Sequence, residues 1–435
     1  MNSRALARAR GSDGTELGLS AATLADEFAA FRDVVGVDAN GVPNGRIAEH
    51  ARALLAPESV WGFDVDVASI TADIAAKLAE NGITSVQDTW MYPEQLRTWL
   101  AWAGDGDMSF RLVAALFPRM QEYRRGLDGE VDIPRVLKAL RALRASAESV
   151  DLVAADGVKI FIDGVIEGNP LADPPSLPNA AVLEPYHQPL FEFDEVSRTV
   201  EVVGYVDTAS ELCTALAAIP TDSAGIEAFR TRHGFHPGQC RISRGVLEHP
   251  QTFVESYVTA LDAEGFTVHA HAIGDRAARL AVDAFETARE ANGGTGLPHN
   301  IAHAQFVHPD DQRRAGALGL FVTLTFAWIE TAPEYDMTVA PFVVGVHGRA
   351  MYERRSPYTA NTYPARTMAD AGVTVVAGSD APVDTPEPRP FFNLQQAITR
   401  SGEAGVLGEH QRLDVYEAVA AYTIDGARAL RQSDR

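Results

Sequence analysis

The chain has 435 residues, of which 46% are hydrophobic and 22% are charged, values close to the averages of globular proteins. Asp and Glu outnumber Lys and Arg by 59 to 37, and the net charge of −22 argues against nucleic acid or an anionic membrane surface as a partner. No run of about 18 apolar residues is present, so the sequence predicts no bilayer-spanning helix.

Helical and strand patterns alternate from about residue 64 onwards. Ser69–Asn81 has the apolar spacing of an amphipathic helix and ends before Gly82. A second, charged helix is predicted over residues 133–149. The strands predicted in this part are Ile83–Asp88, Phe110–Phe117 and Gly157–Gly164.

Residues 168–250 interrupt this alternation. They contain many prolines, a strand pair at Thr199–Val206 and a helical stretch near Ala209–Ala218. Such a segment between two βα units is typical of an insertion, here a lid or an oligomer contact. Cys213 and Cys240 lie in it without metal-ligand spacing, so we expect reduced thiols and a cytoplasmic protein.

The alternation resumes in the second half of the chain. A helix with apolar positions from Ala277 to Ala288 is expected to have Asp275 as its N-terminal cap, and Pro309 begins another. The strand-like segments here are Phe266–Asp275, His299–Gln305, Leu320–Phe326 and Val373–Val383. With the first three they make seven parallel strands with βα spacing, which predicts an α/β fold.

Four of these strands end in a residue that can bind a metal or move a proton, namely Lys159, His271, His303 and Asp380. Because a parallel barrel collects its catalytic groups at the C-terminal strand ends, we expect the four to converge on one mouth. His269 shares the face of His271, since residues two apart on a strand point the same way. A His-x-His pair suits zinc and similar ions.

Each of these residues also has a structural explanation. A buried lysine such as Lys159 loses its proton or gains a partner, and pairing with Asp163 is the commoner outcome. If deprotonated, it can instead react with carbon dioxide to form a carbamate that bridges two cations. His269 can support His271 through a hydrogen bond, and a lone His303 is more often a core histidine than a ligand. Packing does not explain why such residues recur at consecutive strand ends.

The segments VKIFIDG, VHAHAIGDRA, HAQFVHPDD and GSDAPV, with LEPY and Tyr363-Pro364, closely resemble amidohydrolase family 3, the YtcJ-like branch of the amidohydrolase superfamily. The resemblance implies a TIM-like (β/α) barrel that holds one or two divalent ions, with zinc expected. It implies that Lys159 is the carboxylated bridging lysine and that His271 and His303 bind one metal. Asp380 would contact the metal-activated water and shuttle its proton.

One part of the family pattern is missing. Family members begin with a small β-sandwich and a first barrel strand ending in His-x-His, whereas the only histidine before residue 180 is His50, in a helical pattern. We therefore expect a barrel that is incomplete at strand one, the centre of a larger enzyme. The expected division is an interior family segment at 1–63, the barrel at 64–167 and 251–435, and the insertion at 168–250.

The resemblance implies metal-dependent hydrolysis of a non-peptide, amide-type carbon–nitrogen bond in a small molecule, with Asp380 as the general base. Two alternatives stay open. The chain is a catalytically impaired fragment or degenerate non-enzymatic relative, or the barrel performs another metal chemistry, such as decarboxylation or phosphotriester-type hydrolysis. No nucleic-acid or membrane partner is expected, and a homo-oligomer is left open.

Overall fold

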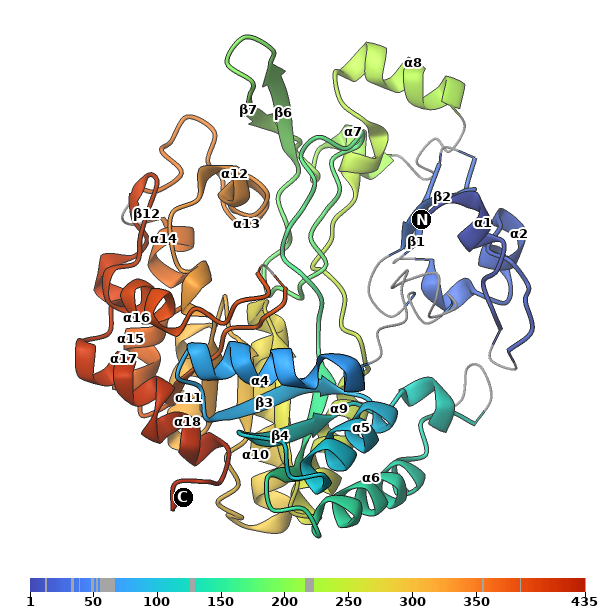
Figure 1. Ribbon diagram of the computed structural model, residues 1–435. Coiled ribbons are helices and arrows are strands. Elements are labelled where there is room, and N and C mark those ends of the chain that lie inside the picture. Colours follow the sequence, from blue (N-terminus) through green and yellow to red (C-terminus); the bar gives the residue numbers. More distant parts are fainter. Residues whose placement is uncertain are drawn as a thin grey trace.

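A curled sheet of seven parallel strands forms the centre of the molecule (Figure 1). The strands lie side by side in chain order, and all neighbouring pairs are parallel. They are β3 Ser85–Met91, β4 Arg111–Leu116, β5 Val153–Phe161, β8 Thr267–Ala272, β9 Asn300–His303, β10 Phe321–Leu324 and β11 Thr374–Ala377. Within the described residues, the edge strands β3 and β11 each have one neighbour, so the predicted incomplete TIM-like barrel is confirmed.

The structure is a computed structural model. It describes residues 1–11, 14–32, 35–38, 40–47, 51, 54, 67–125, 130–215, 223–353, 356–383 and 385–434. His50, which the sequence places in a helical pattern, lies outside these residues. No helix in the described ranges is long and apolar enough to cross a membrane.

Helices follow most of the strands, as the alternating pattern predicts. Those that flank the sheet are α4 Thr71–Glu80, α5 Pro93–Gly104, α6 Ile133–Ala147, α9 Gln251–Ala263, α10 Asp275–Asn292, α11 Pro309–Ala317, α15 Ala365–Asp370, α16 Pro390–Thr399, α17 Val415–Tyr422 and α18 Ile424–Ala429. Shorter helices between β10 and β11 are α12 Pro333–Asp336, α13 Ala340–Val343 and α14 Pro357–Asn361. The helix predicted after β8 is confirmed as α10, which buries its apolar face.

The start of α10 differs from the sequence-based expectation. Its N-cap is Gly274, and Asp275 is the first helical residue. The Asp275 carboxylate accepts a hydrogen bond from the backbone N–H of Leu183 at 2.8 Å instead of capping the helix. The expectation that Asp275 is the cap is therefore wrong, because a distant segment of the insertion supplies its donor.

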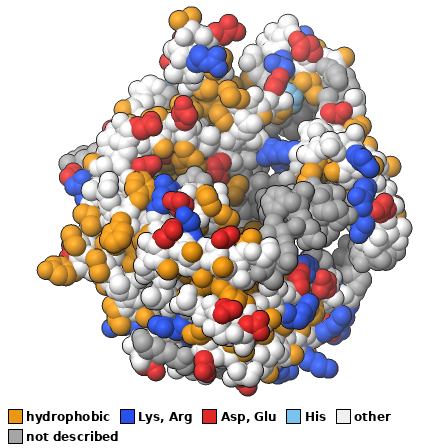
Figure 2. Space-filling view, viewed as in Figure 1, with side chains coloured by type: hydrophobic (Ala, Val, Ile, Leu, Met, Phe, Trp, Pro, Cys, Tyr) orange, Lys and Arg blue, Asp and Glu red, His pale blue; other side chains and the backbone are white. Residues whose placement is uncertain are grey.

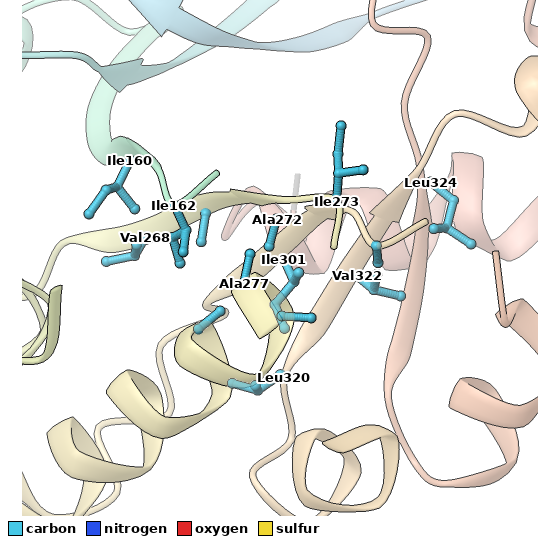
Figure 3. Close-up of a cluster of buried hydrophobic side chains, with 14 of the residues drawn as sticks. Ile160, Ile162, Val268, Ala272, Ile273, Ala277, Ile301, Leu320, Val322 and Leu324 are labelled. Carbon is cyan, nitrogen blue, oxygen red and sulfur yellow. The ribbon is translucent and has the colours of Figure 1, made fainter. Parts of the chain in front are cut away.

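Alternating side chains separate the two faces of the sheet. Figure 3 shows that Ile160, Val268 and Ile301 gather with Ala277 of α10 on the outer face. Full burial of one such aliphatic side chain contributes about 1.5–3 kcal/mol. Because successive strand residues point to opposite faces, Lys159 points to the inside of the curl.

The segment between β5 and α9 forms its own small elements. They are an antiparallel hairpin of β6 Pro189–Asp194 and β7 Thr199–Tyr205, the helices α7 Glu211–Ala215 and α8 Ser223–His233, and a 3-10 helix at Pro237–Cys240. The predicted strand pair at Thr199–Val206 is instead one strand, whose partner is β6. The Tyr205 hydroxyl donates to the carbonyl of Val344 at 3.2 Å, which ties the hairpin to the stretch after α13. The role of the 168–250 insertion as a lid or an oligomer contact stays a prediction.

Cys213 and Cys240 form a disulfide, with their Cα atoms 5.0 Å apart. The expectation of two reduced thiols is therefore wrong. Packing of α7 against the 3-10 helix brings the two residues together although 27 positions separate them in the chain. The cytoplasmic location loses this support and stays a prediction.

The two ends of the chain lie on opposite sides of the sheet (Figure 1). The N-terminal part contains α1 Ser3–Leu6, α2 Ala21–Ala25, β1 Val35–Val37 and β2 Pro43–Ile47, around a small apolar cluster that includes Leu24 and Phe28. The C-terminal helices α17 and α18 contact β11. On the face shown in Figure 2, acidic and basic side chains are interspersed.

Candidate active site

The side chains of Lys159, His269, His271 and His303 meet at the C-terminal end of the sheet. Lys159 pairs in register with His269 on the neighbouring strand, and Ala272 of β8 pairs with His303 of β9. The rings of His271 and His303 have centroids 4.6 Å apart. The charge of Lys159 acts on all three histidines and on Asp380. The structure thus brings all of these residues to one mouth.

Lys159 is buried with 3% of its surface exposed, and its Nζ lies 4.7 Å from the centre of the Phe161 ring. Burial lowers the pKa of Lys159 to about 8, and the negative charge of Asp380 offsets part of this shift. An amine with such a pKa has a larger neutral fraction than an ordinary lysine at neutral pH. A neutral amine is the form that reacts with carbon dioxide, so the site is compatible with a carbamate.

Asp163, the partner that the sequence suggested for Lys159, is fully buried and engaged by backbone donors. Its carboxylate accepts hydrogen bonds from Ala181 N at 2.8 Å, Gly274 N at 2.9 Å and Ile273 N at 3.0 Å. It also lies 3.7 Å from His271 Nε2. Asp163 therefore ties the insertion to the end of β8 beside His271.

His269 and His271 are buried and His303 is half-buried, and desolvation is the main cause that lowers the pKa of each. The pKa of His303 falls to about 3. Neutral imidazole is the form that binds metals. Nε2 of His271 faces the carbonyl oxygen of Gly164 at 3.4 Å, which leaves Nδ1 available. A hydrogen bond from the second ring nitrogen is how metal-binding histidines are commonly oriented.

Nδ1 of His269 is buried and has no hydrogen-bond partner within the described residues. An unsatisfied buried polar atom costs about 1–3 kcal/mol, and a further group that binds this nitrogen would remove that cost. The described side chains contain no group of three or more His, Cys, Asp or Glu residues arranged to hold an ion. The neutral imidazoles fit a zinc-type ion in their chemistry, and a carboxylated Lys159 would add an oxygen donor.

Two of the site residues have a strained backbone. His303 has φ 71° and Asp380 has φ 49°, both in the left-handed region that non-glycine residues seldom adopt. Such a conformation costs of order 1–3 kcal/mol and clusters at functional sites. Asp380 lies beyond the end of β11, not within it, and burial raises the pKa of its carboxyl while Lys159 opposes the rise.

Aromatic rings that the sequence did not single out surround the histidines. Phe161 packs against His271 with centroids 4.9 Å apart, and Trp328 lies nearly parallel to His303 at 5.9 Å and 7°. Trp328 follows the end of β10 in a short 3-10 helix. In the sequence, the position of Trp328 after a barrel strand was the one feature that could have pointed to this residue. These rings keep the surroundings of the cluster apolar.

Comparisons with known proteins identify relatives of this chain. The pattern of the Amidohydrolase family matches residues 15–435. YtcJ of Bacillus subtilis (strain 168) is 24% identical over 185 residues, 42% of this chain and 31% of that protein. The N-substituted formamide deformylase of Arthrobacter pascens is 26% identical over 200 residues, 45% of this chain and 33% of that protein. This chain therefore matches about a third of the length of these relatives.

A solved structure has a similar fold. It is described as an uncharacterized metal-dependent hydrolase from Pyrococcus horikoshii OT3, and it superposes with a TM-score of 0.57 at 19% sequence identity. The superposition covers 94% of this chain and 65% of that one. With the family pattern matched over nearly its whole length and the barrel strands in the expected order, the chain belongs to the amidohydrolase family.

Proposed function

We propose that this chain carries the site of a metal-dependent hydrolase that cleaves a non-peptide, amide-type carbon–nitrogen bond in a small molecule. The observation that carries the proposal is the cluster of Lys159 and His271, which are buried, with His303 and Asp380, which are half-buried. The relative that is named for removing formyl groups from N-substituted formamides supports the choice of bond.

His271 and His303 would hold a divalent metal, zinc being expected, through ring nitrogens that their low pKa keeps neutral. Lys159 would join them as a carbamate, an anionic oxygen donor in place of an ammonium. When bound, the metal supplies Lewis-acid activation of water and of the substrate carbonyl. Asp163 keeps His271 in place, since its carboxylate and the Gly164 carbonyl both face Nε2.

Asp380 is the residue placed to move the proton. Its carboxylate is half-buried and close enough to Lys159 for the two charges to interact. A general base here accepts a proton from the attacking water, and the protonated acid returns it to the departing nitrogen, so the bond breaks with release of an amine. The Phe161 ring beside His271 and the Trp328 ring beside His303 add apolar surface next to the two histidines.

Metal analysis and a substrate panel test the proposal together. We expect purified protein to retain a divalent metal and to hydrolyse amides in preference to carboxylic esters and phosphotriesters. Lys159→Ala should lower the metal content, whereas Lys138→Ala, a change at an exposed lysine of α6, should not. Protein that retains no metal, or that cleaves only esters, would overturn the proposal.

A further inference from the structure

Glu167 is a half-buried carboxylate on the segment that leaves β5, three residues beyond Gly164, whose carbonyl faces His271. Its Oε1 accepts a hydrogen bond from the Tyr335 hydroxyl at 2.8 Å. No Lys, Arg or His among the described residues forms an ion pair with it. Glu167 thus carries a negative charge beside the candidate site with a neutral donor as its partner.

Three tyrosines lie close enough to Glu167 to be affected by its charge, and one of them contacts the segment after His303. Burial raises the pKa values of Tyr335, Tyr363 and Tyr186, and the negative charge of Glu167 adds to each rise. These tyrosines come from three separate segments of the chain. The backbone N–H of Tyr363 donates to the carbonyl of Gln305, two residues beyond His303, at 2.8 Å.

The segment of Glu167 and the segment of Tyr335 are held together by contacts that do not involve the Glu167 carboxylate. The backbone N–H of Gly168 donates to the Thr338 carbonyl at 2.8 Å, and the Thr338 hydroxyl donates to the Tyr335 carbonyl at 2.7 Å. The contact is so close that a Cβ on Gly168 would lie 2.5 Å from the ring of Phe342. Backbone contacts therefore position Glu167 without the use of its charge. The charge is available to interact with a ligand.

We propose that Glu167 is a specificity-determining residue that selects amides bearing a positively charged amino group. A partly desolvated carboxylate without a cation is unfavourable, and an ammonium group of the substrate would supply the missing charge. The Tyr335 hydroxyl orients one carboxylate oxygen and leaves the other for the ligand. This inference rests on the proposed function and names the substrate class of the same site.

A matched pair of amides tests the inference. N-(4-aminobutyl)formamide carries an ammonium group at neutral pH, and N-pentylformamide has a methyl group in its place. We expect kcat/KM to be about tenfold higher for the charged amide. Glu167→Gln should bring kcat/KM of the charged amide down to that of the neutral amide, mainly through KM. Glu334→Gln, at an exposed neighbour of Tyr335 in α12, is the matched control and should keep the preference.

Binding separates this inference from the proposed function. Calorimetry on the full chain measures affinity for both amides whether or not they are hydrolysed, with Asp380→Asn as the background if turnover interferes. Tighter binding of the charged amide that is lost in Glu167→Gln supports the inference even if hydrolysis fails. If that variant does not fold, the preference in the unaltered protein should shrink as salt is added. Equal affinity and equal kcat/KM for both amides would overturn it.

Discussion

Replacement of Asp163 by Asn is expected to lower the free energy of unfolding by about 2–4 kcal/mol. The carboxylate accepts three backbone N–H groups, and the amide offers one oxygen in place of two. Its NH2 group must then face at least one donor. A buried donor left unsatisfied costs about 1–3 kcal/mol, and the remaining bonds lose the strength that a charged acceptor gives them.

Chemical denaturation followed by tryptophan fluorescence measures this loss. The matched control is Asp151→Asn, an exposed carboxylate just before β5, which should change the free energy by no more than about 0.5 kcal/mol. Because Asp163 also lies beside His271, the Asn variant should retain less metal than the control. A loss below about 1 kcal/mol with normal metal content would refute the reasoning.

Three further predictions concern other parts of the molecule. Asp380→Asn should reduce amide turnover by about 10²–10⁴-fold with metal content preserved, and near-normal rates would place the base elsewhere. Burial alone would raise the pKa of Asp262, but hydrogen bonds from His299 and two other side chains lower it below its usual value. The ionised carboxylate therefore stabilises the fold, and this contribution is lost as pH falls through the folded pKa. Asp262→Asn should flatten the acid limb of a profile of unfolding free energy against pH. Cys213→Ser opens a disulfide of sequence separation 27 and should cost about 3–4 kcal/mol, visible as faster proteolysis of the insertion. A profile or a cleavage rate equal to that of the unaltered protein would contradict the last two.

The contacts of His299 show why the pH prediction depends on the tertiary structure. Its Nδ1 accepts from Val268 N at 3.1 Å, so Nε2 carries the proton that faces Asp262 Oδ1 at 2.9 Å. The ring also stacks on Phe285. In the sequence, His299 is only the first residue of a strand-like segment. Its partners lie on α9, β8 and α10, and folding alone brings them together.

The repeating patterns of the sequence determined the architecture. Apolar runs and helical spacing predicted the seven strands and α10, and the spacing of two in β8 put His269 on the same face as His271. These features depend on residues a few positions apart, and a period of 2 or 3.6 records them directly. The order of chemically suitable strand ends then predicted the members of the cluster, because parallel strands end on the same side of a sheet.

Only the tertiary structure decided the contacts between segments that lie far apart in the chain. Asp163, for which the sequence suggested Lys159 as a partner, accepts hydrogen bonds from residues as distant as Gly274, 111 positions away. The two cysteines become a disulfide, and Glu167 meets Tyr335 across 168 positions. No local period records such pairings, since they arise when loops of different strands pack against one another. The sequence by itself therefore determined which strands carry the chemistry, and the packing of the loops decided which side chains support it.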